Sequence, residues 1–278
     1  MKKRIGLIIF FVAILSSLIS YSFFSGQKET KDLKSKKEIQ YRTIPNNAFT
    51  YGERFDYKVI YSFITAGTGF FLISPKPLYR DNNRPCYEIM FSVESLKSLA
   101  FLYRIKNWYR SVIDAEGIFP WEFEQHNREN DYKRDFKAIF DHTKKIAIVG
   151  DKSYSIPPLV HDLVSAFYYV RTLNIGKMRK DSVFYLQNFY DDQTYSLGVK
   201  ILGKQVISVE AGQFKCIVVE PLVVKGGLFK SEGNIIIWLT DDENKMPIKV
   251  AAKIPIGFVS AELTSYSGLK NPPTAKMN

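Results

Sequence analysis

The chain has 278 residues, of which 46% are hydrophobic, and a formal net charge of +11. This apolar content is ample for one large core or two small ones, and the charge favours anionic partners such as glycolipids, acidic glycans or a membrane surface. The spacing of the only two cysteines, Cys86 and Cys216, excludes a CxxC redox or zinc motif.

Residues 1–25 have the layout of a secretory signal. Three cations precede an apolar run from Ile5 to about Ile19, and small residues follow at cleavage-like spacing. We expect cleavage after Ser22. The alternative is an uncleaved anchor and membrane association through this segment, since a bilayer span takes roughly 20 apolar residues. Both forms predict an exported bacterial protein in the periplasm or at the outer envelope, where nucleic acid is not an expected partner.

The rest of the chain divides by composition into three parts. Residues 26–47 are polar and lysine-rich, which predicts a flexible tether able to stay near anionic lipid. Residues 48–270 form a single β-rich domain in this interpretation. Residues 271–278 are expected to be a short frayed tail.

Strand signals dominate from Tyr51 onward. Apolar residues alternate with mostly polar ones from Phe55 to Phe63 and from Tyr87 to Val93, which predicts sheet strands with one apolar face. β-branched and aromatic residues fill the later candidates, as a half-buried pleated surface requires. These further strands are expected at 121–124, 132–140, 146–149, 154–156, 195–201, 205–209, 214–219, 235–239, 248–254 and 259–266.

One segment breaks the strand pattern. From Pro157 to Leu173 the apolar residues follow helical spacing, and the prolines suit a helix start. The predicted fold is therefore mainly β, a curved antiparallel sheet or incomplete barrel with one mid-chain amphipathic helix. The helix would cover an open end of the sheet or lie in its concavity.

Four segments carry a resemblance to a known family. They are FTYGERFDYKVIYSFITAG from Phe49, HDLVSAFYYVRTL from His161, GQFKCIVVEP from Gly212 and IIIWLTDDENKMPIKV from Ile235. Together they resemble the family catalogued as domain of unknown function 3108, over roughly residues 48–268. The resemblance implies an exported bacterial protein with an antiparallel, barrel-like fold, and it implies no catalytic residues.

Motifs for catalysis or metal binding are weak in this sequence. The three histidines, His126, His142 and His161, form no HExxH pattern, and there is no GxSxG motif. The glycines of Gly67-Thr68-Gly69 precede a strand, so we expect them at a bend or bulge. Acidic pairs at 191–192 and 241–243 could supply an acid and base or calcium ligands, but turn chemistry explains them more simply. We therefore predict no catalytic residue, metal or cofactor.

A basic cluster is the candidate ligand site. In YRIKNWYR, Arg104, Lys106 and Arg110 share one strand face with Trp108, which would suit an anionic or sugar-bearing ligand. The alternative is an ordinary solvated sheet face. Cys86 and Cys216 could form a disulfide outside the cytosol, and a buried free thiol at Cys216 is equally natural.

These observations favour a non-enzymatic envelope protein that binds or handles an amphipathic lipid or glycan component, with an anionic lipid or glycolipid as its expected partner. The motivation is the export signal, the aromatic strands and the absence of catalytic motifs. Two alternatives stay open. One is a hydrolase or lyase acting on envelope glycan or lipid through dispersed carboxylates, and the other is a structural partner in an envelope complex.

Overall fold

The computed structural model describes residues 41–80, 83–101, 103–223, 235–253 and 257–277. The signal-like segment 1–25 and most of the expected tether lie outside these residues. Within them, no helix is both long enough and apolar enough to span a bilayer.

All strands belong to one antiparallel sheet, which confirms the predicted fold class. Its order is β10-β11-β12-β13-β14-β15-β1-β2-β4-β5-β6-β7-β8-β9, with β3 beside β4 and β16 beside β12. The strands are β1 (Arg54–Tyr61), β2 (Ile64–Ile73), β3 (Leu78–Arg80), β4 (Arg84–Ser95), β5 (Lys106–Asp114), β6 (Pro120–Glu129), β7 (Tyr132–Asp141), β8 (Ile146–Val149), β9 (Lys152–Ser155), β10 (Val183–Tyr190), β11 (Gln193–Val209), β12 (Gly212–Val223), β13 (Ile235–Thr240), β14 (Pro247–Lys253), β15 (Phe258–Ser267) and β16 (Lys276–Met277).

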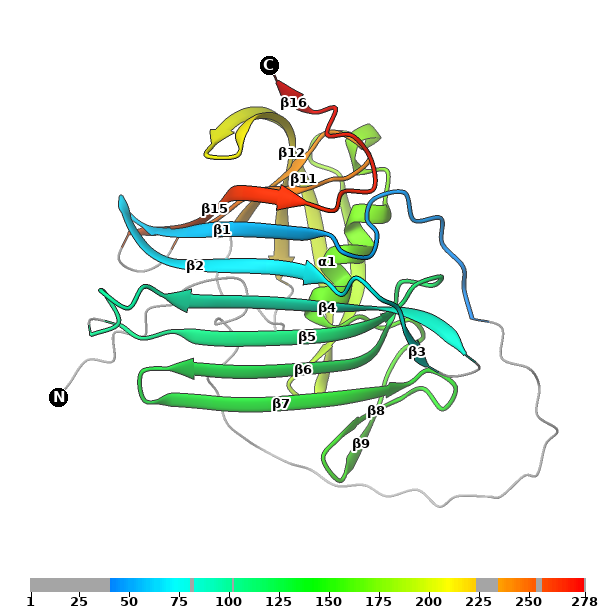
Figure 1. The fold of residues 1–278 in the computed structure, drawn as a ribbon. Helices are drawn as coiled ribbons and strands as arrows, with labels where there is room; N and C mark the ends of the chain where they lie inside the picture. Colours follow the sequence, from blue (N-terminus) through cyan, green and yellow to red (C-terminus); the bar gives the residue numbers. More distant parts are fainter. Residues whose placement is uncertain (1–40, 81–82, 102, 224–234, 254–256, 278) are drawn as a thin grey trace, which may run out of the picture.

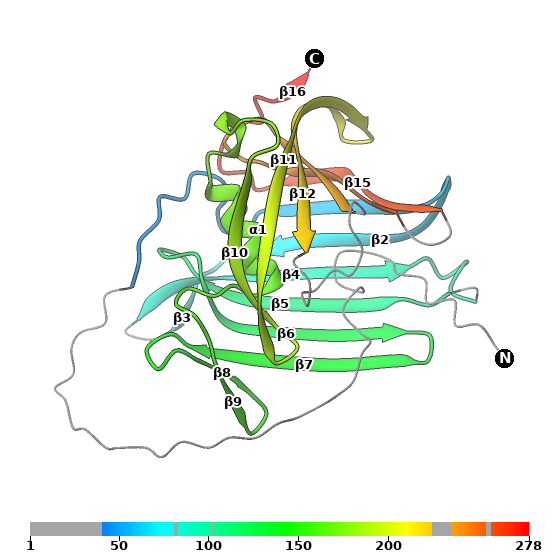
Figure 2. The same cartoon turned by 180° about the vertical axis from the view of Figure 1, so that it is seen from behind.

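The strands of the curved sheet alternate between a buried face and a more exposed one. In β4, Ile89, Phe91 and Val93 are buried, and the residues between them are half-buried. The inward side chains meet on the concave side in one continuous core that includes residues of the helix α1 (Leu163–Thr172). Figures 1 and 2 show α1 inside the curve, between the β1–β7 wall and the strands β10 to β12.

Gly67 on β2 lies beside a shift in strand register. The register between β1 and β2 shifts after Val59, opposite Gly67, which confirms the bulge expected there. A Cβ on Gly67 would collide with the backbone oxygen of Glu94 on the neighbouring strand. Glycine is therefore required by close backbone approach at this position.

The two ends of the sheet meet through side chains. Arg134 on β7 lies 2.7 Å from Asp191, next to β10, and the Tyr154 hydroxyl on β9 donates to Asp192 at 2.8 Å. The free edge of β10 also bonds to the segment before α1, where the His161 N–H donates to the Gln187 carbonyl at 2.8 Å. Between β9 and β10 no backbone ladder forms within the described residues, so the barrel is incomplete.

The helix begins later than its sequence pattern predicts. Asp162 is its N-cap, and one carboxylate oxygen accepts from the Val164 and Ser165 N–H groups at 2.7 and 2.9 Å. The prolines at 157 and 158 precede this cap, and Leu159 has φ +58°, so the chain before Asp162 is not helical. The prediction of the helix is confirmed and its predicted start is wrong, because a side-chain cap sets the first turn.

A fully buried ion pair fixes the other end of α1. Arg171 Nη1 lies 2.6 Å from Glu53 Oε1, and both side chains have no exposed surface. The guanidinium also donates to the carbonyls of Asn244 and Ala48, and it lies over the Phe49 ring at 5.2 Å. One side chain therefore joins the helix, the segment before β1 and the β13–β14 turn.

Both predicted flexible ends fold onto the sheet within the described range. Arg42 donates to the carbonyls of Gly117 and Ile118 at 2.7 and 2.9 Å, so residues 41–47 are not part of a tether. At the other terminus β16 pairs with β12, and the Ala275 N–H donates to Asp242 at 3.1 Å. Short polar segments can be ordered by hydrogen bonds that composition does not reveal.

Replacing Arg171 tests the buried pair. Arg171→Met should lower the free energy of unfolding by about 3–5 kcal/mol, because it leaves Glu53 buried and unpaired. The matched control is Arg54→Met, which breaks a half-exposed pair with Asp56 and should cost about 1 kcal/mol or less. Urea unfolding followed by tryptophan fluorescence gives both values. Equal decreases in the free energy of unfolding for the two variants would show that the buried pair stabilises the fold no more than an exposed one.

Acid stability tests the buried His161. Its pKa is lowered from 6.5 to about 3 by burial and by the nearby Arg42. The unfolded chain therefore binds a proton that the folded chain refuses, and stability falls as the pH falls from 6.5 toward 3. When the pH is lowered from 7 to 4.5, the free energy of unfolding should fall by on the order of 2 kcal/mol more for the wild type than for His161→Gln.

Burial raises the pKa of the neighbouring Asp162 to about 6, so its protonation increases stability as the pH falls. This contribution is present in both the wild type and the variant, and the comparison between them removes it. Urea titrations at the two pH values supply the comparison. Parallel pH profiles for wild type and variant would contradict the assignment of a neutral buried imidazole.

Candidate ligand-binding hollow

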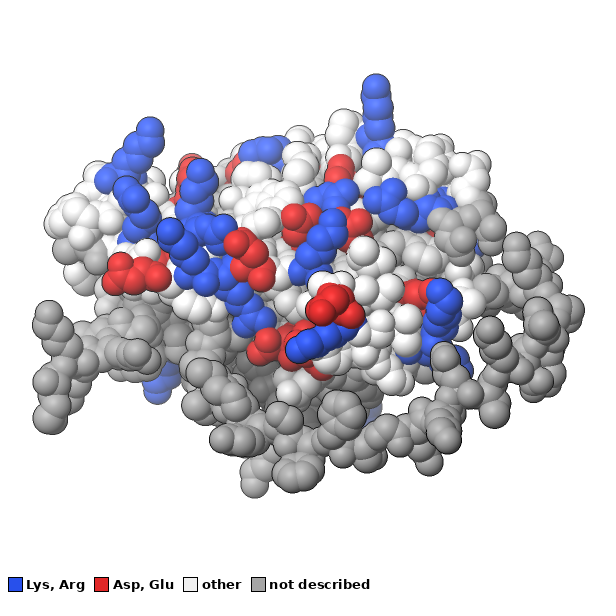
Figure 3. Space-filling view, turned by 90° about the horizontal axis from the view of Figure 1, so that it is seen from below, with Lys and Arg blue, Asp and Glu red and all other residues white. Residues whose placement is uncertain are grey.

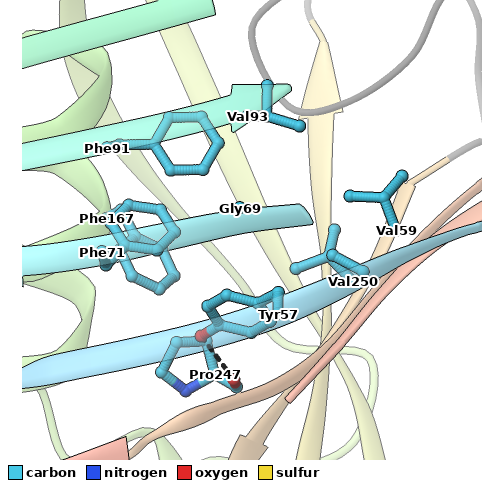
Figure 4. A pocket seen from close by; sticks show the side chains of 10 residues that line it. Tyr57, Val59, Gly69, Phe71, Phe91, Val93, Phe167, Pro247 and Val250 are labelled. Atoms are coloured by element: carbon cyan, nitrogen blue, oxygen red, sulfur yellow. Dashed lines mark hydrogen bonds between the residues drawn. The ribbon is translucent and has the colours of Figure 1, made fainter. Parts of the chain in front are cut away.

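The concave side of the sheet holds two apolar pockets on either side of one helix residue, Phe167. The first contains about 420 Å³ of space, part of it open to solvent. Side chains from β1, β2, β4, β14, β15 and α1 form its wall, as Figure 4 shows. The lining residues are Tyr57, Val59, Gly69, Phe71, Phe91, Val93, Phe167, Pro247, Val250 and Ala261.

Stacked aromatic rings make one side of this pocket. Phe71 stacks on Phe91 with 4.4 Å between ring centroids and on Phe167 with 5.6 Å. Phe91 in turn stacks on Tyr109 at 5.5 Å. Aromatic surfaces in this arrangement are rigid and apolar, so they suit a hydrocarbon ligand.

The one polar group on the lining side chains is already satisfied. The buried Tyr57 hydroxyl donates to the Pro247 carbonyl at 2.8 Å, as the dashed line in Figure 4 marks. Burial raises its pKa well above the usual value, so the phenol stays neutral. Tyr57 therefore offers the pocket an aromatic ring and no free hydrogen-bonding group.

The second pocket lies on the other side of Phe167 and holds about 560 Å³, also partly open. Its wall comes from the inner faces of β11, β12 and β13 and from α1. The lining residues are Leu163, Ala166, Phe167, Val170, Leu197, Val199, Val219, Pro221, Ile235, Ile237 and Leu239. None of them carries a titratable or hydrogen-bonding side chain.

Both pockets are lined almost entirely by apolar groups. Small-molecule sites usually combine an apolar wall with a few polar groups for orientation. Here the walls supply neither an acid nor a base, and general acid–base chemistry needs one within hydrogen-bond reach. The chemical character of both pockets is therefore apolar.

Three of the four residues of the predicted basic cluster lie on β5, and Arg104 lies before it. Lys106, Trp108 and Arg110 share the outer face of β5, as the alternation predicts, while Asn107 and Tyr109 point inward and are buried. Arg104 precedes the strand and is exposed.

The Arg110 charge is neutralised by two carboxylates. Its guanidinium lies 2.6 Å from Glu88 and 2.7 Å from Glu122. Trp108 packs on His126 with ring centroids 5.2 Å apart. Arg104 and Lys106 form no ion pair with the described residues, so these two cations are available to a ligand. A binding role for the four residues stays a prediction.

Charges of both signs lie on the face seen from below. Figure 3 shows lysine and arginine side chains gathered toward the left of this view, with carboxylates among them. Lys137 is one of the paired cations, because it lies 3.0 Å from Glu122.

The acidic pairs occupy turns, as expected. Asp242 accepts from the Thr240 hydroxyl at 2.7 Å and from the Asn244 N–H at 3.1 Å, which closes the β13–β14 turn. Asp191 and Asp192 lie in the β10–β11 turn, where they contact Arg134 and Tyr154 at the other end of the sheet. We call this junction the seam. Within the described residues, no group of three or more potential ligands is arranged to hold a metal ion.

A serine–histidine contact near the helix start was not foreseen. Ser165 Oγ lies 3.3 Å from His161 Nδ1, which resembles a nucleophile and its base. However, the same oxygen also accepts from the Asp162 N–H at 2.9 Å, and all three residues are buried. Neither Ser165 nor His161 lines either pocket. The group is a capping box that orders the helix.

Both cysteines are buried free thiols. Cys86 on β4 belongs to a small cluster with Val112, Phe119 and Trp121, whereas Cys216 on β12 lies in the main core. The disulfide considered from the sequence is not formed, and the buried thiol is the arrangement found. Burial raises the pKa of each thiol to about 12, so neither is a reactive thiolate.

Three solved structures are similar in chain course, each at 10% identity. A β-barrel-like protein of the DUF1849 family from Brucella abortus has a TM-score of 0.49, with 80% of this chain and 99% of that one covered. A candidate lipoprotein from Parabacteroides distasonis scores 0.35, with 81% and 100% covered. An exported protein with a YmcC-like fold from Bacteroides fragilis scores 0.28, with 81% and 98% covered. Scores this low indicate neither ligand nor activity.

No curated protein matches the chain. A family model does match, over residues 56–264, which spans the sheet from β1 to β15 and includes α1 and both pockets. Its description is a protein of unknown function, DUF3108. The chain therefore belongs to the DUF3108 family.

Proposed function

We propose that this protein binds the acyl part of an amphipathic envelope lipid in the two pockets beside Phe167, without catalysing a reaction on it. The observation that carries the proposal is the pair of apolar pockets within an otherwise packed core. The signal-like residues 1–25 support a site of action in the cell envelope.

The energetics favour a chain over a compact polar ligand. Each buried methylene contributes about 0.8 kcal/mol, so a chain that fills one pocket gains enough to offset the cost of association. The walls offer no partner for a charged head group, and leaving such a group buried and unpaired is costly. The head group therefore stays at the solvent-open side of the pocket.

Affinity should rise with chain length until the hollow is filled. For saturated fatty acids of increasing length, the dissociation constant should fall by about fourfold per methylene and then level off. Isothermal titration of the delipidated protein measures the series, and mass spectrometry of an organic extract identifies bound lipid in the untreated protein. No bound lipid and no dependence on chain length would together overturn the proposal.

Filling the first pocket should weaken binding. Ala261 on β15 lines that pocket, whereas the preceding Ser260 has its side chain on the opposite face of the same strand. Ala261→Phe should reduce affinity for a long-chain fatty acid by about tenfold or more, because the new ring occupies the ligand volume. Ser260→Phe is the matched control and should bind like the wild type. Equal effects of the two variants would place the ligand elsewhere.

Removing Phe167 tests whether the two pockets act as one site. Phe167→Ala should join them, so the chain length at which affinity levels off should increase. The same titration series gives this value, and circular dichroism checks that the sheet is retained. A plateau at the wild-type length would mean that a ligand uses only one side of the helix.

A further inference from the structure

One end of the sheet exposes large apolar side chains on separate connections. Phe63 in the β1–β2 turn is 88% exposed, Phe101 in the β4–β5 connection is 80% exposed, and Phe258 at the start of β15 is 61% exposed. Ile64 beside Phe63 is 48% exposed. We call this end, with the turns that form it, the rim.

These connections are neighbours in space. The Ser62 N–H donates to the Phe258 carbonyl at 2.8 Å, which joins the β1–β2 turn to the start of β15. The Leu96 N–H donates to the Ala66 carbonyl at 2.9 Å, which joins the β4–β5 connection to β2. The β1–β2 and β6–β7 turns lie at the same end of the sheet, at the left of Figure 1.

Exposed cations surround the apolar tips. Lys97, Arg104 and Lys106 lie on or beside the β4–β5 connection, Lys133 follows the β6–β7 turn, and Lys253 ends β14. None of the five forms an ion pair with a described residue, in contrast to Arg110 and Lys137 farther from the rim. The exposed carboxylates on the same connections are Glu94 and Asp131.

The first pocket lies just inside this end. Val59 and Val93 line it, and each is two residues from the rim end of its strand, at Tyr61 and Ser95. Apolar tips ringed by cations, next to an apolar hollow, have the chemistry of a surface that enters the interface of an anionic bilayer.

We propose that the rim docks on an anionic lipid bilayer, with Phe63, Phe101 and Phe258 in the headgroup region and the surrounding cations on lipid phosphates. Aromatic rings suit the boundary between acyl chains and headgroups, and lysine and arginine supply the charge complementarity. In this orientation, the end of the sheet that lies nearest the first pocket faces the membrane. The proposal goes beyond acyl binding and does not depend on it.

A site-specific probe tests the docking in the full chain. Since Cys86 and Cys216 are buried, an exposed Ser98→Cys in the β4–β5 connection can be labelled selectively with the fluorophore NBD. Vesicles of phosphatidylglycerol and phosphatidylethanolamine should shift its emission to the blue, and phosphatidylcholine vesicles should not. The control Lys76→Cys lies between β2 and β3 at the opposite end of the sheet and should not respond.

Because both labelled proteins keep the N-terminal segment, tethering by that segment cannot produce a difference between them. A response at both positions, or at neither, would overturn the proposal.

Two sets of variants in the Ser98→Cys protein separate the apolar and charged contributions. Phe63→Ser with Phe258→Ser, and separately Arg104→Glu with Lys106→Glu, should each raise the lipid concentration for half-maximal shift by about tenfold or more. Lys152→Glu with Lys180→Glu changes the same number of exposed charges away from the rim and should leave that concentration unchanged. If this control raised the lipid concentration equally, binding would depend on overall charge, and the proposal that the rim docks on the bilayer would be wrong. None of these measurements uses a fatty acid, so failure here leaves the acyl-binding test independent.

Discussion

The buried pair between Arg171 and Glu53 is the constraint on which the interior depends. Apolar packing of the helix against the curved sheet is non-directional, whereas hydrogen bonds and ion pairs have a fixed direction. The guanidinium supplies direction through its contacts with Glu53 and with the carbonyls of Ala48 and Asn244. Asp162 fixes the other end of the helix through its cap and through Ser111 on β5. Phe167 is thereby held between two walls, and the space on either side of it remains.

The hollow is a consequence of small residues opposite large ones. Gly69 and Ala261 contribute almost no volume where the strands curve, whereas Phe71, Phe91 and Phe167 are stacked and cannot collapse into the gap. Close packing elsewhere in the core keeps these side chains in place. The interior therefore combines a rigid aromatic wall with unfilled apolar space.

The architecture could be predicted from the sequence, but only part of the candidate site could. Alternation in β4 and in β5 correctly predicted strands with one inward face, since period-two patterning depends only on burial. The start of α1 was wrong because Asp162, and not the prolines, provides the cap. His161 is buried beside Arg42, 119 residues away in the chain, which local composition could not indicate. Arg171 and Glu53 are 118 residues apart, so neither could be recognised as a partner from its neighbours. The first pocket depends on which inward residues are small in six elements, and that information is not local.

At the seam, among the described residues, only side chains join the edge strands β7–β9 to the β10–β11 turn. Two side-chain contacts, Arg134 with Asp191 and Tyr154 with Asp192, span the gap together with rings such as Phe140 and Phe189. Parting them breaks no ladder hydrogen bond among the described strands, so a slightly wider cross-section costs far less than unzipping a closed barrel. Such a widening would leave every described strand paired with its neighbours.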